Sequence, residues 1–233
     1  VVVQFTRVPH GLNPKALQGL VTVSNFHGLS ARIIRAHANV IGVSQDLTIP
    51  ESDWVAEQCR ARGLAPKMSM DVQARLRAAK LEGLDDEAVA AELERSGNVI
   101  ALEIERQRVA ERRLTYDDLP RLAELILSND SVAELYRNHF AAVIVDEFQD
   151  LTPQQLRIVN RIGYGKTTYA GDLAQGIYSF AGAKPDEIYA ALQAECADVI
   201  EFSESHRSSP SVLGMVNAMR GLTGGQILIA ADP

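Results

Sequence analysis

Short runs of apolar and β-branched residues alternate along the chain with longer stretches in which apolar residues recur every three or four positions. The short runs are typical of buried strands, and they cover residues 1–5, 19–26, 140–150, 167–172 and 198–203. The longer stretches predict amphipathic helices, and they cover residues 27–42, 83–97, 115–130, 152–162 and 186–196. Because strands that are apolar throughout are buried on both faces, the alternation predicts an α/β fold with a parallel sheet that helices cover on both sides.

The composition and periodicity of the chain change between about Pro50 and Arg113. This segment is rich in Ala, Arg, Glu and Leu at helical spacing, and it contains no strand-like run. Its clearest helix lies at 83–97, where acidic residues occupy the first turn and Gly97 follows the end. The segment therefore predicts an all-helical insertion between two parts of the α/β fold.

The segment Gly165-Lys166-Thr167 looks like the end of a phosphate-binding P-loop. A P-loop needs a glycine five positions earlier, so that successive backbone N–H groups can surround the phosphates, and this position is Asn160. A P-loop also follows a strand and opens a helix, whereas here a predicted helix comes first and a predicted strand follows. We therefore expect an ordinary helix-to-strand turn with a solvated lysine.

Composition narrows the class of protein only a little. With 233 residues, 46% of them hydrophobic, the chain can bury a substantial core. The formal net charge of −7 gives no support to a nucleic-acid partner, although a local basic groove can occur in an acidic protein. The two cysteines lack metal-ligand spacing and no apolar run reaches transmembrane length, so we expect a cytoplasmic protein with no membrane partner. Because Val1 lies directly in a strand-like run, we also expect an excised piece of something longer.

The segment VIVDEFQD at 143–150 carries the strongest chemical signal. Its adjacent carboxylates follow a buried strand, at the edge where α/β sheets bind ligands. In this position Asp146 can hold Mg²⁺ through water, and Glu147 can polarise a water that attacks a γ-phosphate. An acidic pair at a strand end is common, but the full octet with Gln149 and Asp150 is far more specific.

Six segments, in the right order along the chain, resemble motifs of UvrD/Rep-type superfamily one DNA helicases. VIVDEFQD resembles motif II, and AGDLAQGIYSFAGA at 170–183 resembles motif III. Upstream, VVVQFTR at 1–7 resembles motif Ia, VSNFHGLSARIIRAHA at 23–38 resembles motif Ib, and LTYDDL at 114–119 resembles the acidic segment before motif II. EFSESHRSSPSVLGMVNAM at 201–219 resembles motif IV. The resemblance covers nearly the whole chain.

The resemblance implies a RecA-like parallel sheet with helices on both faces, incomplete in this chain, and an inserted all-α subdomain. Residues 1–48 would form the first part of the RecA-like motor domain, and residues 49–113 the helical subdomain. Residues 114–196 would form the second part of the motor domain, and residues 197–233 the start of a second RecA-like domain. The family's P-loop would come before Val1, and its motifs V and VI are missing from the 233 residues.

The resemblance also implies roles for particular side chains, with ATP and Mg²⁺ as cofactors. Asp146 would hold the metal through water and Glu147 would act as the general base. Gln175 would sense the γ-phosphate and couple it to the grip on DNA. Arg207 would reach the γ-phosphate as a charge-stabilising finger, and His206 would stack on the adenine. Aromatic side chains can stack on any base, so such binding does not depend on the DNA sequence. The residues that would bind single-stranded DNA and its junctions with duplex are Phe5, Thr6, Arg7, His27, Tyr178 and Phe180.

Three positions depart from the family pattern. Gly176 stands where the family usually has Ser. Ala181 stands where it usually has Arg, which removes a cation beside the DNA track or the nucleotide cleft. His206 stands where it usually has Tyr and offers a smaller surface for stacking. These departures bear on nucleotide affinity and on coupling rather than on the fold.

Three functions stay open at the level of sequence. The leading interpretation is a bacterial-type DNA-dependent ATPase and helicase of repair or replication, associated with the nucleoid when on DNA. The resemblance implies that it moves 3′ to 5′, which the sequence by itself does not give. This chain would be a fragment of it, inactive on its own. The second is a remnant that binds nucleic acid or protein without hydrolysis, against which the intact polar residues of motifs II, III and IV argue. The third is a P-loop NTPase unrelated to nucleic acid, against which the aromatic residues of motifs Ia and III argue.

Overall fold

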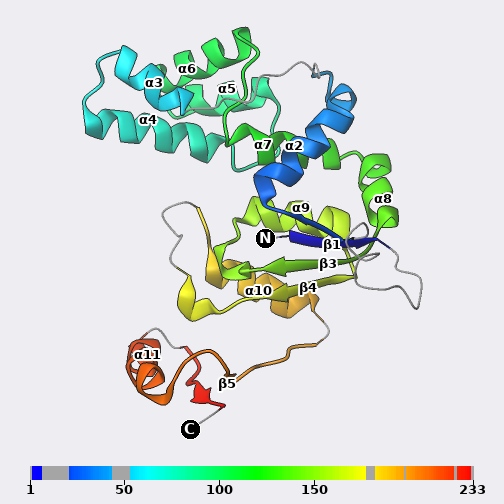
Figure 1. Cartoon of the computed structure of the whole chain (residues 1–233). Helices are drawn as coiled ribbons and strands as arrows, with labels where there is room; N and C mark the ends of the chain where they lie inside the picture. Colours follow the sequence, from blue (N-terminus) through cyan, green and yellow to red (C-terminus); the bar gives the residue numbers. More distant parts are fainter. Residues whose placement is uncertain are drawn as a thin grey trace. The chain divides into compact units, whose positions relative to one another are not determined.

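The computed structural model describes residues 2–6, 21–43, 53–176, 182–196, 198–222 and 225–231, and for residues 2–6 it describes the backbone alone. Helices and strands both contribute to the fold, as Figure 1 shows, so the mixed class expected from the sequence is confirmed. The chain divides into two compact units. The first comprises Val1–Val145 with Gln154–Thr168, and the second comprises Asp146–Pro153 with Tyr169–Pro233.

A four-stranded sheet has the strand order β2-β1-β3-β4, and Figure 1 labels its strands β1, β3 and β4. Its strands are β1 (Val2–Thr6), β2 (Val21–Ser24), β3 (Phe140–Asp146) and β4 (Thr167–Ala170). β1 runs antiparallel to β2, with Val3 opposite Val23, and antiparallel to β3, with Val3 opposite Ile144. The expectation of a parallel sheet is therefore wrong for these pairs. Continuous apolarity indicates burial on both faces of a strand, but the direction of the strand depends on how the chain connects it.

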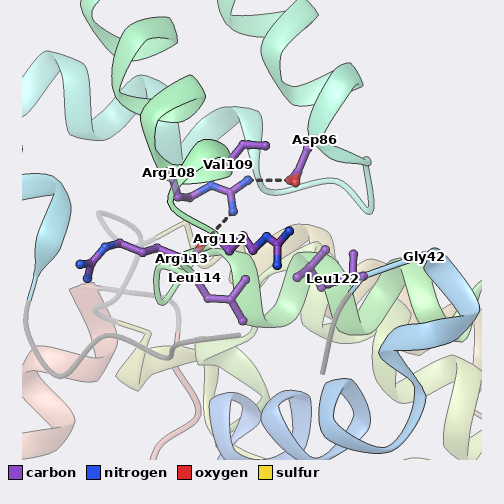
Figure 2. A pocket seen from close by; sticks show the side chains of 9 residues that line it. Gly42, Asp86, Arg108, Val109, Arg112, Arg113, Leu114 and Leu122 are labelled. Carbon is purple, nitrogen blue, oxygen red and sulfur yellow. Dashed lines mark hydrogen bonds and ion pairs between the residues drawn. The ribbon is translucent and has the colours of Figure 1, made fainter. Parts of the chain in front are cut away.

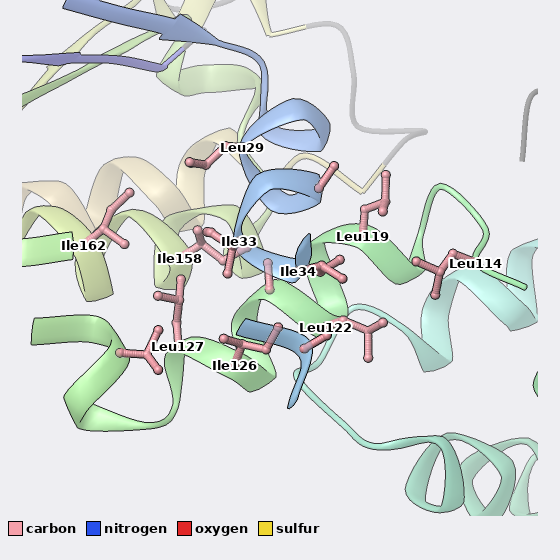
Figure 3. Packing of buried hydrophobic residues seen from close by; sticks show 14 residues of the cluster. Leu29, Ile33, Ile34, Leu114, Leu119, Leu122, Ile126, Leu127, Ile158 and Ile162 are labelled. Carbon is pink, nitrogen blue, oxygen red and sulfur yellow. The ribbon is translucent and has the colours of Figure 1, made fainter. Parts of the chain in front are cut away.

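The main hydrophobic core of the first unit lies where four helical segments meet. These are α2 (Phe26–His37), α7 (Asp118–Leu127), α8 (Asp130–His139) and α9 (Pro153–Gly163), and the short η1 (Ala38–Ile41) extends α2. Ile33, Ile126 and Ile158 are fully buried at this meeting point (Figure 3). The apolar periodicity of the predicted helices at 27–42, 115–130 and 152–162 therefore marks the faces that build the core.

Residues 53–113 form a group of four helices. They are α3 (Trp54–Ala61), α4 (Pro66–Ala79), α5 (Asp86–Arg95) and α6 (Val99–Ala110). Side chains that accept a backbone N–H cap three of them at Asp53, Asp85 and Asn98. The helices enclose a core of their own that includes Trp54, Val89 and Leu93. The described part of the predicted helical segment is thus helical, but it belongs to the same compact unit as the sheet. Its status as a separate subdomain stays a prediction.

A buried cluster of charged side chains joins this helical group to α7. Its members are Lys80, Asp86, Glu105, Arg108, Asp118 and Arg121, and all but Asp86 are at most 2% exposed. Lys80 Nζ lies 2.8 Å from Glu105 Oε2 and 3.0 Å from Asp118 Oδ1, and Arg121 Nη2 lies 2.9 Å from the same Asp118 oxygen. Burial by itself would raise the pKa of Asp118, but Lys80, Arg108 and Arg121 together hold it well below its usual range. Cations and anions balance in this cluster, as buried charges require.

The described residues of the second unit form two helical turns, two longer helices and a small parallel sheet. Its elements are η2 (Phe148–Asp150), η3 (Leu173–Gln175), α10 (Pro185–Glu195), β5 (Glu204–Ser205), α11 (Pro210–Leu222) and β6 (Ile229–Ala230), and β5 pairs with β6. The ring of Phe148 stacks on that of Tyr189 of α10, with the ring centroids 6.4 Å apart. Asn217 fixes α11 to the strand region, because its side chain donates to the Leu228 carbonyl at 2.8 Å and accepts from the Leu228 N–H at 2.9 Å.

One predicted strand does not form. Residues 198–203 have no regular structure, and the apolar side chains that suggested a buried strand are exposed: Val199 at 63%, Ile200 at 76% and Phe202 at 79%. The short strand β5 begins directly after them. An apolar run becomes a strand only when a neighbouring strand is available to pair with it. The start of a second RecA-like domain in this region stays a prediction.

Candidate functional site

The acidic pair of the octet lies where β3 ends. Val143 and Val145 are fully buried, whereas Asp146 and Glu147 are exposed. Glu147 has a left-handed backbone conformation (φ 57°), which is uncommon for a residue other than glycine. Its backbone N–H donates to Asp146 Oδ1 at 3.1 Å. The chain therefore turns sharply after the strand and presents both carboxylates to solvent.

Gln149 is buried beside this pair and connects two loops. Its Nε2 donates to Glu147 Oε2 at 2.6 Å, and its Oε1 accepts from the Asp172 backbone N–H at 3.0 Å. Gly171 permits this approach, because an added Cβ would lie 2.2 Å from Gln149 Oε1 and 2.9 Å from the Phe148 nitrogen. The motif resemblance implied no separate role for Gln149. Its membership of the octet was the only signal.

The hydrogen bonds continue from Asp172 to Gln175. Asp172 Oδ1 accepts from the Ala174 N–H at 3.1 Å and so caps η3, and Asp172 Oδ2 accepts from Gln175 Nε2 at 2.9 Å. Two residues that the sequence predicts for the site, Glu147 and Gln175, are thus joined through Gln149 and Asp172. We call these four residues the Glu147–Gln175 chain. Hydrogen bonds arranged in such a series polarise one another and orient their members.

Lys166 of the Gly-Lys-Thr segment makes hydrogen bonds within the protein. The expected helix-to-strand turn is confirmed, because Gly165 (φ 74°) lies between α9 and β4. The expectation of a solvated lysine is wrong. The Lys166 ammonium is half-buried and donates to the carbonyl oxygens of Arg137 and Phe140, at the end of α8 and the start of β3. Its side chain therefore serves the fold rather than a phosphate.

His27, predicted to lie on the single-strand track, is the second residue of α2. Its ring contacts that of Tyr116 edge to face, with centroids 5.7 Å apart. Desolvation lowers the pKa of His27 against the opposing effect of Asp117, which favours the neutral form of the ring. Tyr116 is 52% exposed and was not singled out by the sequence, although it lies within the LTYDDL segment. The two rings form an aromatic pair at the surface of the first unit.

Comparison with known proteins decides which family the chain is in. The family model described as the UvrD/REP helicase N-terminal domain matches residues 6–195. The chain belongs to the UvrD/REP helicase family. The match includes every residue of the Glu147–Gln175 chain, and it confirms the resemblance to this family.

The chain is similar in sequence to several proteins that are named as helicases. DNA helicase II of Escherichia coli (strain K12) is 28% identical over 219 residues, which cover 87% of this chain and 30% of that protein. The ATP-dependent DNA helicase Rep of Salmonella typhimurium is 35% identical over 124 residues, or 52% of this chain and 17% of that protein. UvrD2 of Mycobacterium tuberculosis is 32% identical over 118 residues, or 49% and 17%. The chain spans less than a third of the length of these curated relatives.

The motif IV residues of this UvrD/REP chain are not joined to the site. Arg207 and His206 follow β5 and are both exposed, and the Arg207 backbone N–H donates to Ser205 Oγ at 3.4 Å. Within the described ranges, no hydrogen bond or ion pair connects either side chain to the Glu147–Gln175 chain. Their contact with a nucleotide stays a prediction.

The structure describes only part of the predicted DNA-binding set. Arg7, Tyr178 and Phe180 lie outside the described residues, as does the departure at Ala181. The backbone of Phe5 and Thr6 lies in β1, and their side chains are outside the description. Among the predicted DNA contacts, the structure thus describes the side chain of His27 alone.

The octet is compatible with Mg²⁺. One oxygen of Asp150, Oδ1, is buried without a hydrogen-bond donor, and burial together with Glu147 raises the pKa of this carboxyl. Within the described ranges, no group of three or more His, Cys, Asp or Glu is arranged to hold a metal ion. Mg²⁺ does not need such a group, since it keeps several waters and binds through one or two carboxylates and substrate phosphates. Asp146 would supply that carboxylate.

Across the described residues, no helix combines the length and apolarity needed to cross a membrane.

Proposed function

We propose that this chain is part of an ATP-driven helicase that moves along single-stranded DNA. The observation that carries the proposal is the Glu147–Gln175 chain, which joins a candidate base to a candidate phosphate sensor inside one compact unit. Family membership and relatives named ATP-dependent DNA helicases support it. ATP and Mg²⁺ are the implied cofactors, and Mg²⁺ would neutralise charge on the transferred phosphoryl group.

In the proposed mechanism, Glu147 accepts the proton of the attacking water. Gln149 donates to Glu147 Oε2 and so fixes the orientation of the carboxylate, which leaves Oε1 to receive the proton. Asp146 would hold Mg²⁺ through water. Gln175 donates through Nε2 to Asp172, and its Oε1 can accept from the attacking water and position it against the γ-phosphate.

Motif IV and the aromatic residues complete the proposal. Arg207 would stabilise charge on the γ-phosphate and His206 would stack on the adenine. Single-stranded DNA and its junctions with duplex would be gripped by the aromatic and polar residues predicted from motifs Ia, Ib and III, which are Phe5, Thr6, Arg7, His27, Tyr178 and Phe180. A role in DNA repair belongs to the same proposal.

We also propose that residues 1–233 do not hydrolyse ATP by themselves. The phosphates of a nucleotide need a loop of backbone N–H groups and a lysine to hold them. The Gly-Lys-Thr segment of this chain is a helix-to-strand turn, and its lysine binds backbone carbonyls. Mg²⁺ on Asp146 alone cannot position a γ-phosphate.

His27→Ala tests the DNA side of the proposal. In the complete protein, this change should weaken binding of single-stranded oligonucleotides by roughly 1–3 kcal/mol, the usual contribution of one base–aromatic stack. The loss should be similar for oligothymidine and for mixed sequences, because stacking contacts the faces of the bases. Fluorescence anisotropy titrations at one fixed salt concentration measure both values.

His139→Ala is the matched control, because His139 is also exposed and also contacts an aromatic ring edge to face, that of Phe140. It should bind DNA like the wild type. Equal affinities for wild type and His27→Ala, with equal melting temperatures, would remove His27 from the DNA track and return it to a structural role beside Tyr116.

A further inference from the structure

Arg220, near the end of α11, is a buried residue that the sequence motifs do not cover. It is 8% exposed, and its guanidinium faces the carboxylate of Asp172. Nη2 donates to Asp172 Oδ1 at 3.1 Å, and Nη1 donates to Asp172 Oδ2. The guanidinium thus meets both carboxylate oxygens at once, an arrangement that fixes the plane of the carboxylate.

The Asp172 carboxylate is shared with Gln175. Oδ2 receives Gln175 Nε2 at 2.9 Å as well as Arg220 Nη1, and Oδ1 receives the Ala174 N–H at 3.1 Å as well as Arg220 Nη2. Burial opposes ionisation of Asp172, but hydrogen bonds from Arg220 and Gln175 hold its pKa below the usual range. The carboxylate is therefore a charged junction between α11 and the Glu147–Gln175 chain.

The structure around Arg220 holds its side chain in place before any ligand binds. Its Nε donates to the Gln226 carbonyl at 2.6 Å, and its own carbonyl accepts from the Gly225 N–H at 2.9 Å. Gly225 also lies close to η3, since an added Cβ would be 2.6 Å from Ala174 Cβ. Because Asn217 ties α11 to the strand region as well, Arg220 is part of a rigid element and not a mobile surface cation.

We propose that Arg220 is a positioning residue, which sets the orientation of Gln175 through the Asp172 carboxylate that both side chains share. The inference rests on the proposed function of Gln175 and adds its regulation: the position of α11 becomes linked to phosphate sensing. If α11 withdraws Arg220, Asp172 loses two of its donors and can rotate. Gln175 then loses the fixed acceptor that directs its amide toward the attacking water.

The test is a double-mutant cycle in the complete protein, with ATP hydrolysis measured at saturating single-stranded DNA. Arg220→Gln should lower kcat roughly ten-fold to a hundred-fold, the scale of a misplaced catalytic group, while KM for ATP changes little. Gln175→Ala should lower kcat at least as much. The double variant should be no slower than Gln175→Ala alone, because Arg220 acts through Gln175.

Arg220→Lys covers the case in which Arg220→Gln does not fold. Lysine keeps the charge but cannot meet both carboxylate oxygens, so this variant should fold, hydrolyse ATP at an intermediate rate and show the same non-additivity with Gln175→Ala. Lys184→Gln is the matched control, since Lys184 pairs with Glu187 at the surface of the same unit, and both side chains are more than half exposed. It should hydrolyse ATP like the wild type.

The outcomes separate the inference from the proposed function. Wild-type rates in Arg220→Lys and Arg220→Gln with an impaired Gln175→Ala would overturn the role of Arg220 and leave the proposed function standing. Effects of Arg220 and Gln175 that multiply would also overturn it, because Arg220 would then act by another route. A wild-type rate in Gln175→Ala would instead contradict the sensing role on which the proposed function depends.

Discussion

Replacing Glu147 by Gln should leave nucleotide binding nearly intact and lower ATP hydrolysis by about 10²–10⁴-fold, the usual contribution of a general base. The experiment uses the complete protein in the presence of single-stranded DNA. Gln keeps the shape of Glu and can still contact Gln149, but its amide cannot accept a proton from the attacking water. Single-turnover hydrolysis and the affinity for a fluorescent ATP analogue give the two numbers separately.

Two controls make this result specific. Glu201→Gln removes an exposed carboxylate of the same unit and should hydrolyse ATP like the wild type. The 233-residue chain by itself should show no ATP turnover with or without DNA. Hydrolysis within a few-fold of wild type in Glu147→Gln would exclude Glu147 as the base. DNA-stimulated turnover by the isolated chain would contradict the proposal that it is inactive alone.

Replacing Asp118 by Asn should lower the free energy of unfolding of the first unit by about 3–5 kcal/mol, the cost of removing one partner from a buried ion pair. Asp118 is 0% exposed and accepts from Lys80, Arg121 and Thr115. The variant leaves the buried cations Lys80, Arg108 and Arg121 with less negative charge to balance them. Trp54, the single tryptophan, is 6% exposed in the helical group, so its fluorescence during urea unfolding reports on this unit.

Acid should reduce the difference between wild type and Asp118→Asn. The pKa of Asp118 is lower in the folded than in the unfolded chain, where it is about 3.9. The stabilisation by Asp118 is therefore complete well above the unfolded pKa and is lost as the pH falls through the folded pKa.

The control for Asp118→Asn is Asp130→Asn, which removes an exposed ion pair with Arg161 and should lower the free energy of unfolding by less than about 1 kcal/mol. Equal stability of wild type and Asp118→Asn at pH 7 would show that the buried cluster does not hold the helical group to α7.

Local patterns in the sequence were sufficient for most elements and for the octet. The acids of VIVDEFQD follow a buried strand, as predicted, because apolar continuity and an abrupt change to carboxylates are both local signals. The missing glycine at Asn160 was likewise enough to reject a P-loop at Gly165. Strand direction was not predictable in the same way. β1 pairs antiparallel with its neighbours, and that depends on connections that apolarity does not encode.

Contacts between distant charged residues could not be read from the sequence. Lys80, Glu105 and Asp118 are far apart along the chain, and each lies among other charges, a pattern typical of solvated helix faces. Arg220 and Asp172 meet only because the second unit brings α11 to η3. The prediction of a solvated Lys166 was wrong for the same reason. The carbonyl acceptors of Lys166 come from α8 and β3, and a local sequence pattern does not reveal them.

The central claim is that the Glu147–Gln175 chain links the base to phosphate sensing, and Gln149→Met in the complete protein tests it most directly. Met fills the volume of the buried Gln149 but removes its hydrogen bonds to Glu147 and to the Asp172 N–H. The measurement is the ratio of ATP hydrolysis with and without saturating single-stranded DNA, alongside the melting temperature and the affinity for ATP. The account predicts that the variant folds and binds ATP, while stimulation by DNA falls at least about ten-fold, as for other misplaced catalytic groups. A folded Gln149→Met protein that DNA stimulates as strongly as the wild type would contradict the account.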